Sequence, residues 1–227
     1  MTQTPFLSEA DRDRVGAAVH QAESASAGEI VTIITPQSDS YAEVALVWCA
    51  LVAFTALVVL ALFPDFYLAL VDRLTGNWQT AWTPRHVFEL ALFVAIAKFI
   101  AMWLLQLWQP LRLFLVPSFI KNARVRARAV TCFKVGAERR THGRTGVLIY
   151  LSLAEHRAEI VADEAIASQV APEVWGDAMA AMTALIRQGQ VADGMIAAVT
   201  RVGAVLAEHF PRAENDINEL PDRLIEV

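Results

Sequence analysis

The chain has little cysteine and none of the short motifs that mark common catalytic sites. Its 227 residues include only Cys49 and Cys132, which form no CxxC pair, so a disulfide framework and a structural zinc site are both excluded. The sequence contains no GxSxG, no GxxxxGKS and no HExxH motif. It therefore carries no signature of a serine hydrolase, a phosphate-binding loop or a zinc protease.

Charge is also scarce, and apolar residues are abundant. Charged residues make up 19% of the chain and apolar residues 56%, with a formal net charge of −5. This composition excludes a disordered or collagen-like chain. The mean hydropathy of +0.40 is high for a soluble protein of this size, and it directs attention to membrane segments.

Two long apolar runs predict a transmembrane hairpin. Residues 44–63 contain no charge, and about 20 apolar residues in a helix cross the ~30 Å hydrocarbon core of a bilayer. The second predicted span covers residues 87–108, with Thr83 as N-cap and Pro110 as the residue that stops the helix. We take residues 44–109 as the hairpin.

The distribution of charge predicts the orientation of this hairpin. Residues 110–145 carry nine Lys or Arg and one acid, whereas residues 64–86 carry two of each sign. Basic residues flanking a span stay on the cytoplasmic side. The first residues also lack the basic and apolar regions of a signal peptide. We expect a multi-pass protein of the bacterial inner membrane with both termini in the cytoplasm.

The middle of the second span contains one cation, Lys98. A lysine at that depth costs about 3 kcal/mol of insertion free energy. One interpretation is an ion pathway or an intramembrane partner, and the other is a lysine that snorkels or packs against a helix. The sequence leaves both open.

The remaining residues predict one α/β domain. Ser8 starts a helix that ends near Ser24, and residues 29–35 read as an apolar, β-branched strand. After the hairpin come a basic helix from Ser118 with an apolar face of Phe119, Ala123, Val130 and Phe133, a strand hairpin that turns near Glu155, and two helices starting at Pro172 and Asp193. Three strands with helices on both faces imply a small covered sheet, built from residues 1–43 and 110–227 and interrupted by the hairpin.

The order and spacing of several segments resemble the TPM domain family, in its bacterial membrane-protein branch with a hairpin inserted in the domain. The segments are SEADRDRVGAAVHQAESASAGEIVTIITPQSDSY, RTGVLIYLSLAEHRAEIVADEAI, IRQGQVADGMIAAVTRVGAVLAEHFP and NELPD. The resemblance implies an α/β/α sandwich. It also implies two properties of some members: a proposed acid phosphatase activity, in proteins linked to photosystem II maintenance, and calcium binding.

Three acids are the candidate metal ligands. Asp163 and Glu164 follow a predicted strand, where ligands bind in open α/β sheets, and Asp193 opens the last helix. Together they offer oxygen ligands for a hard cation such as calcium, and the alternative is helix capping by Asp193 and solvation of the other two. Two further clusters of charged residues are interpreted as structural rather than ligand-binding. Residues 214–222 are expected to form a solvated acidic tail, and His142 and Arg144 to lie in a basic turn before a strand.

The basic helix predicts contact with anionic lipid head groups. Its cations are Lys121, Arg124, Arg126 and Arg128. They follow a span directly, and each cation near an anionic bilayer contributes about 1 kcal/mol. Residues 146–227 carry 13 acids and five bases, which argues against nucleic acid. We expect a non-catalytic module that binds a protein partner or a cation, and the alternative is a metal-assisted acid phosphatase.

Overall fold

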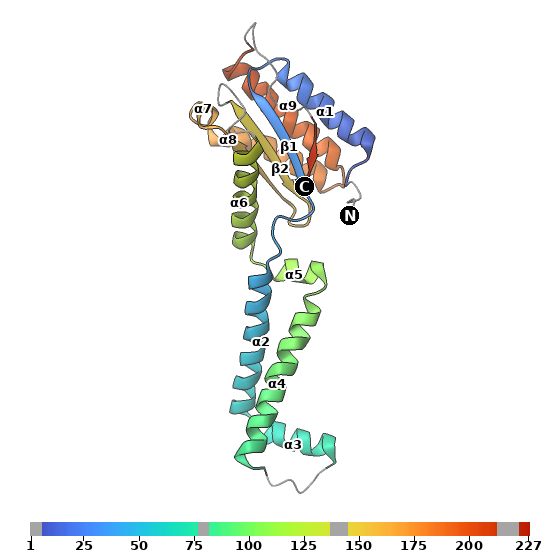
Figure 1. Ribbon diagram of the computed structural model, residues 1–227, viewed down its shortest axis with the longest axis vertical. Coiled ribbons are helices and arrows are strands. Elements are labelled where there is room, and N and C mark those ends of the chain that lie inside the picture. Colours follow the sequence, from blue (N-terminus) through green and yellow to red (C-terminus); the bar gives the residue numbers. More distant parts are fainter. Residues whose placement is uncertain (1–5, 77–81, 137–144, 213–222) are drawn as a thin grey trace. The chain divides into compact units, whose positions relative to one another are not determined.

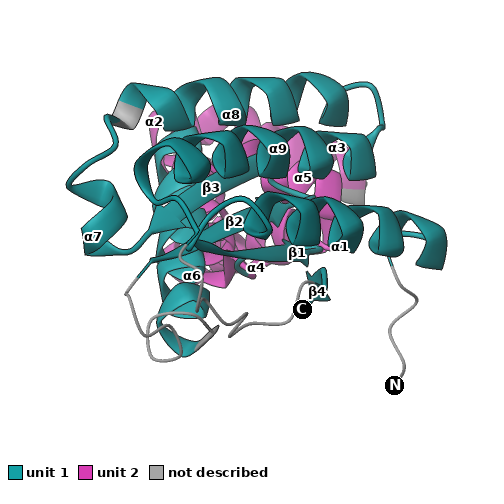
Figure 2. Cartoon of the chain, turned by 90° about the horizontal axis from the view of Figure 1, so that it is seen from above, with its two compact units in different colours: residues 1–39, 118–227 teal, residues 40–117 magenta. Residues whose placement is uncertain are grey.

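The computed structural model describes residues 6–76, 82–136, 145–212 and 223–227, and it divides into two compact units (Figures 1 and 2). Unit 1 comprises residues 1–39 and 118–227, and unit 2 comprises residues 40–117. The boundaries predicted after residue 43 and before residue 110 therefore lie inside unit 2. Trp78, His142, Arg144 and the acidic tail of residues 214–222 lie outside the described residues.

Unit 1 is built on a mixed sheet with the strand order β3-β2-β1-β4. The strands are β1 (Glu29–Thr35), β2 (Gly146–Ser152), β3 (Arg157–Ala162) and β4 (Ile225–Glu226). β1 pairs in parallel with β2 and β4, whereas β2 and β3 form an antiparallel hairpin. The predicted pairing of the first strand beside the later hairpin is confirmed, but the sheet has a fourth strand that the sequence did not reveal.

The two central strands are buried on both faces, as expected of parallel strands. Side chains of β1 and β2 alternate between two apolar cores. Ile30 and Ile34 of β1 join the larger core, whereas Val31 and Ile33 join the smaller one. Burial on both faces explains why most residues of these two strands are apolar.

Helices cover both faces of the sheet, which confirms the predicted α/β sandwich (Figure 2). One face carries α1 (Glu9–Glu23), α8 (Pro172–Ile186) and α9 (Val191–His209), and the other carries α6 (Ser118–Gly136). The predicted N-cap of α1 is confirmed, because the Ser8 side chain accepts a hydrogen bond from the Asp11 amide at 3.1 Å. In α9 an apolar stripe at helical spacing is fully buried and comprises Met195, Val199, Val202 and Leu206.

The face that α6 presents to the sheet differs from the prediction. Val125, Ala129 and Phe133 are buried, whereas Phe119 is 70% exposed and Ala123 is also exposed. Both stripes have helical spacing, so periodicity alone did not distinguish them. Docking on β1 and β2 selects the stripe that meets the smaller core.

The described residues of unit 2 form four helices: α2 (Ala42–Leu62), α3 (Pro64–Thr75), α4 (Pro84–Leu105) and α5 (Gln109–Leu115). α2 and α4 are long and apolar enough to cross a membrane, and they run side by side (Figure 1). The Thr83 cap is confirmed, since its side chain accepts from the His86 amide. Pro110 does not stop α4, which ends at Leu105; it stands in the first turn of α5 instead.

A buried amide joins the two long helices of unit 2. Gln106 Nε2 donates to the Ala45 carbonyl at 3.1 Å and contacts the Cys49 sulfur at 3.4 Å. Cys49 is buried at this contact and packs as a small apolar residue. An amide that bonds across two apolar helices fixes their register.

Candidate functional site

Two of the three predicted metal ligands follow β3. Asp163 is 3% exposed, and its Oδ2 accepts a hydrogen bond from the Gly146 amide at 3.2 Å. The Asp163 amide returns a bond to the Gly146 carbonyl at 2.9 Å, so the aspartate extends the pairing of β2 and β3. Glu164 is exposed and begins the short helix α7 (Glu164–Ala167), an element that the sequence did not reveal.

The third predicted ligand, Asp193, contacts a different part of unit 1. It is the third residue of α9, and the N-cap is Gln190 rather than Asp193. Its Oδ1 accepts a hydrogen bond from the Arg14 guanidinium of α1. Hydrogen bonds to Asp193 and then Asp11 raise the pKa of Arg14 above its ordinary value. Asp193 therefore links the starts of α1 and α9 and suits the positive end of the α9 dipole.

The structure keeps Asp163 and Glu164 adjacent but gives Asp193 its own ionic partner. Among the residues with described positions, no group of three or more His, Cys, Asp or Glu side chains is placed to hold a metal ion. The calcium site stays a prediction, and Asp163 and Asp193 each have a structural contact that calcium ligation would have to replace.

The four cations of α6 that were predicted to contact lipid fall into two pairs. Arg124 Nε lies 3.1 Å from Asp39 Oδ2, and an Arg126 guanidinium nitrogen lies 3.8 Å from Glu159 Oε2. Neither Lys121 nor Arg128 forms an ion pair within the described part of the chain. Of the four predicted lipid-binding cations, these last two carry positive charge that no acid among the described residues of unit 1 neutralises.

The environment of Glu159 is half-buried and electrostatically mixed. Burial raises the pKa of the Glu159 carboxyl, and the nearby Arg126 lowers it in part. Burial likewise raises the pKa of the Cys132 thiol on α6, which keeps this thiol in its neutral, unreactive form.

A buried polar cluster, which the sequence did not reveal, lies at the carboxyl ends of β1 and β2. Glu155 is 4% exposed; its Oε1 accepts from the Ser38 amide at 2.9 Å and its Oε2 accepts from the Ser152 hydroxyl. Ser38 Oγ also lies 3.0 Å from the Tyr150 hydroxyl, whose pKa is raised chiefly by burial. Both carboxylate oxygens are thus occupied, so the cluster joins the segments that follow the two strands. The signal that points to it is the parallel pairing of the strands, which brings both carboxyl ends to one edge.

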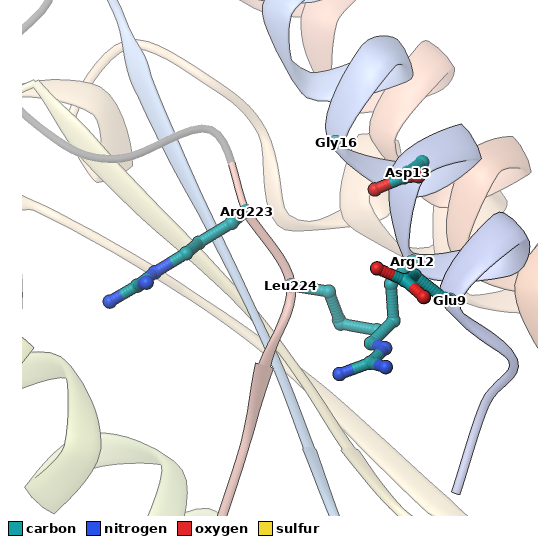
Figure 3. A pocket seen from close by; sticks show the side chains of 6 residues that line it. All are labelled: Glu9, Arg12, Asp13, Gly16, Arg223 and Leu224. Atoms are coloured by element: carbon teal, nitrogen blue, oxygen red, sulfur yellow. The ribbon is translucent and has the colours of Figure 1, made fainter. Parts of the chain in front are cut away.

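A hollow of about 350 Å³ lies between α1 and the residues before β4 (Figure 3). Its lining mixes charges of both signs: Glu9, Arg12, Asp13, Gly16, Arg223 and Leu224. Arg12 Nε is buried without a hydrogen bond and lies 4.0 Å from Glu226 Oε1, too far for a strong pair. In the close-up the Arg223 side chain extends away from Asp13 of α1, so the lining groups do not converge on one point.

Comparisons with known proteins give one family and one fold. Residues 110–205 match the family model TPM_phosphatase, described as the TPM domain. The NMR structure of the BA42 protein from the psychrophilic bacterium Bizionia argentinensis resembles the chain with a TM-score of 0.56 and 17% identity, over 100% of this chain and 99% of that one. A search of curated proteins found no significant match. The family match excludes α1 and β1, yet β1 pairs along its full length with β2 inside the matched region.

Proposed function

We propose that the chain is an integral inner-membrane protein. Its α/β domain would be a non-catalytic binding module in the maintenance of membrane proteins. The proposal is supported by the match of residues 110–205 to the TPM domain model. The module binds a partner protein or a cation beside the bilayer. The proposal combines the predicted membrane hairpin with the α/β unit whose sequence the hairpin interrupts.

The observation that supports the proposal is the exposed apolar surface of α2 and α4. In the most apolar window of each helix, 6% of the residues of α2 and none of α4 are buried. The core helix of a soluble protein would be mostly covered, because exposed apolar area costs about 25 cal/mol per Å² in water. Lipid tails cover such a surface without this cost.

The proposed orientation follows from charge. Unit 2 continues into Ser118 of α6, and the basic residues 110–145 follow the second span directly. Because cationic flanks remain in the cytoplasm, unit 1 and both termini are proposed to be cytoplasmic. The loop between α3 and α4 is then on the opposite side of the membrane.

Lys121 and Arg128 are the proposed contacts for anionic lipid head groups. Lys121 lies four residues after the end of unit 2, and neither cation pairs with an acid in the part of unit 1 that the structure describes. Arg124 and Arg126 contribute less, because Asp39 and Glu159 already offset their charge. A bilayer with phosphatidylglycerol therefore stabilises the protein by up to about 1 kcal/mol for each of the two cations that remain.

Nanodiscs test this contact on the full chain. We expect the unfolding midpoint to rise when phosphatidylglycerol is added to phosphatidylcholine, and salt to reduce the rise. The double variant Lys121→Gln and Arg128→Gln loses most of it. Lys134→Gln, which removes a cation at the other end of α6, is the matched control and keeps the rise. An equal rise in the double variant and the wild type contradicts the contact.

The alternative function is a metal-assisted phosphatase, which the name of the matching family model favours. Asp163, Glu164 and Asp193 would be its metal ligands. The proposal of a non-catalytic module predicts no hydrolysis of p-nitrophenyl phosphate by the full chain, with or without calcium. Turnover that is lost in Glu164→Gln, an exposed position that leaves the fold intact, overturns the proposal in favour of the phosphatase.

Calcium itself is tested by thermal stability. A ligand that binds only the folded state raises the free energy of unfolding by RT ln(1 + c/Kd) at free ligand concentration c, and the unfolding midpoint rises with it. A rise in millimolar calcium that disappears in Glu164→Gln supports the predicted site. An unchanged midpoint contradicts it and leaves a protein partner as the ligand of the module.

A further inference from the structure

Unit 2 contains an apolar groove with one charge on its rim. The groove has a volume of about 590 Å³ and is lined by residues of α2, α3 and α4. Apolar side chains line most of it, including Trp48, Leu51, Val59 and Val94. Lys98 of α4, Thr55 of α2 and Tyr67 of α3 add polar groups.

Lys98 has no ion-pair partner among the described residues of its own hairpin. It is exposed and forms no hydrogen bond or ion pair with any residue whose position is described. α2 and α4 contain one carboxylate each, Glu43 in the first turn of α2 and Glu89 of α4. Glu89 Oε1 is bound by Arg85 Nε at 2.8 Å. The charge at mid-helix therefore costs the isolated hairpin about 3 kcal/mol of insertion free energy.

Snorkelling to the head groups relieves little of this cost. Lys98 lies about 21 Å after the first residue of α4 and about 10 Å before its last, at 1.5 Å per residue. Helical side chains tilt toward the N-terminus of their helix, so Lys98 leans toward the more distant end of the span. A four-carbon stem does not bridge that distance.

The groove offers a packing surface as well as a charge. Thr55 and Ala56 line it on α2, and small residues of this kind let a further helix approach closely in a membrane. A second groove of about 330 Å³, lined by Ala53, Phe54 and Ile96 among others, contains only apolar residues. The charge of Lys98 thus distinguishes the groove of about 590 Å³ from this all-apolar groove.

We propose that the Lys98 groove binds a transmembrane helix of another protein that carries one carboxylate at the depth of Lys98. This inference rests on the proposed function and names the chemistry of the partner. A second copy of the chain does not supply the carboxylate, because it inserts in the same orientation and presents its own lysine at that depth. A lipid phosphate lies at the surface rather than at mid-span.

A model helix provides the probe. The full chain, labelled with a fluorescence donor, is placed in phosphatidylcholine and phosphatidylglycerol vesicles with an acceptor-labelled Leu-Ala transmembrane peptide. The peptide carries Asp, Asn or Leu at its centre. We expect the Asp peptide to associate most strongly. Lys98→Leu weakens its association by about threefold to eighteenfold, given interhelical polar energies of about 0.6–1.7 kcal/mol in membranes, and Lys98→Arg preserves it.

Two further variants separate the groove from the charge alone. Thr55→Trp fills the groove and weakens association although Lys98 is intact. Phe54→Leu alters the all-apolar groove and is the matched control, with association unchanged. Equal energy transfer with the Asp and Leu peptides overturns the inference, as does transfer that is unaffected by Lys98→Leu. Self-transfer between labelled copies that depends on Lys98 indicates a second copy instead and also overturns it.

Protease protection of the hairpin in the same vesicles distinguishes the two possible failures. If the spans are protected but the Asp peptide does not associate preferentially, only the partner inference is wrong. If the spans are digested, the proposed membrane protein itself is wrong.

Discussion

Gly203 of α9 lies directly against Ala22 of α1, so that a Cβ built at position 203 would be 2.5 Å from the Ala22 Cβ. Real side chains do not approach this closely, and the contact includes the Ala22 backbone at 3.2 Å. The two helices therefore pack through a glycine, and any larger residue there must push them apart.

Gly203→Ala is expected to destabilise the protein in spite of the higher helix propensity of alanine. Overpacking of this kind costs about 1–3 kcal/mol of the free energy of unfolding. The matched control is Gly176→Ala in α8, where nothing lies within 4 Å of the added Cβ and alanine stabilises a helix by about 0.5–1 kcal/mol. Denaturant titration measures the free energy of unfolding of both variants. A Gly203→Ala variant as stable as the control contradicts the close packing.

The raised pKa of the Glu159 carboxyl predicts a contribution to the free energy of unfolding that falls as pH rises. Its carboxyl pKa is raised in the folded protein, so the folded state binds this proton more tightly than the unfolded state does. Between the unfolded pKa and the raised folded pKa, stability falls with increasing pH, and above the folded pKa the loss is complete. Glu159→Gln removes this component, and Arg126→Ala extends the window to higher pH because Arg126 lowers the pKa.

Unfolding midpoints between pH 4 and pH 7 measure this effect. The wild type loses more stability across the range than Glu159→Gln does. Parallel curves for the two proteins show that burial of Glu159 does not favour its protonated form.

The sequence predicted the central strands and the covered sheet, because these depend on local patterns. The bounds of β1 and the turn near Glu155 follow from β-branched runs and turn residues. Asp163 and Asp193 are different, since their partners, Gly146 and Arg14, are 17 and 179 residues away in sequence. No local pattern indicates that these carboxylates are already occupied.

The missed strand and the misassigned face of α6 have a similar cause. β4 has only two residues, and pairing with Ile33 and Ile34 of β1 defines it. The stripe of Val125, Ala129 and Phe133 is buried because it meets the core beside β2. In each case the local sequence fits two structures equally well, and a contact with a distant part of the chain selects one of them.

α3 is expected to lie in the membrane interface. Its exposed apolar residues Phe66, Leu70 and Leu74 are spaced by four and form one stripe, whereas Asp65 and Asp72 lie on the other face. α3 starts one residue after Phe63, the C-cap of α2, and α2 alone covers about 31 Å, the thickness of the hydrocarbon core. Such a helix buries its apolar face at the boundary of head groups and acyl chains.

Nitroxide labels measure the depth of α3 in vesicles. A label at Leu70 is expected to contact oxygen dissolved in lipid at shallow depth, and a label at Asp65 to contact a water-soluble nickel reagent. A label at Phe54, in the middle of α2, is the deep reference. Equal access of the nickel reagent to positions 65 and 70 contradicts the interfacial helix.

The central claim is that one folded α/β unit is interrupted by a hairpin that crosses the bilayer and returns. Paired reporter fusions test it most directly, one at Trp78 between the two spans and one at the carboxyl terminus. We predict that alkaline phosphatase is active only at Trp78 and that green fluorescent protein is fluorescent only at the carboxyl terminus. If both positions report the same compartment, the hairpin does not cross the membrane and the account is contradicted.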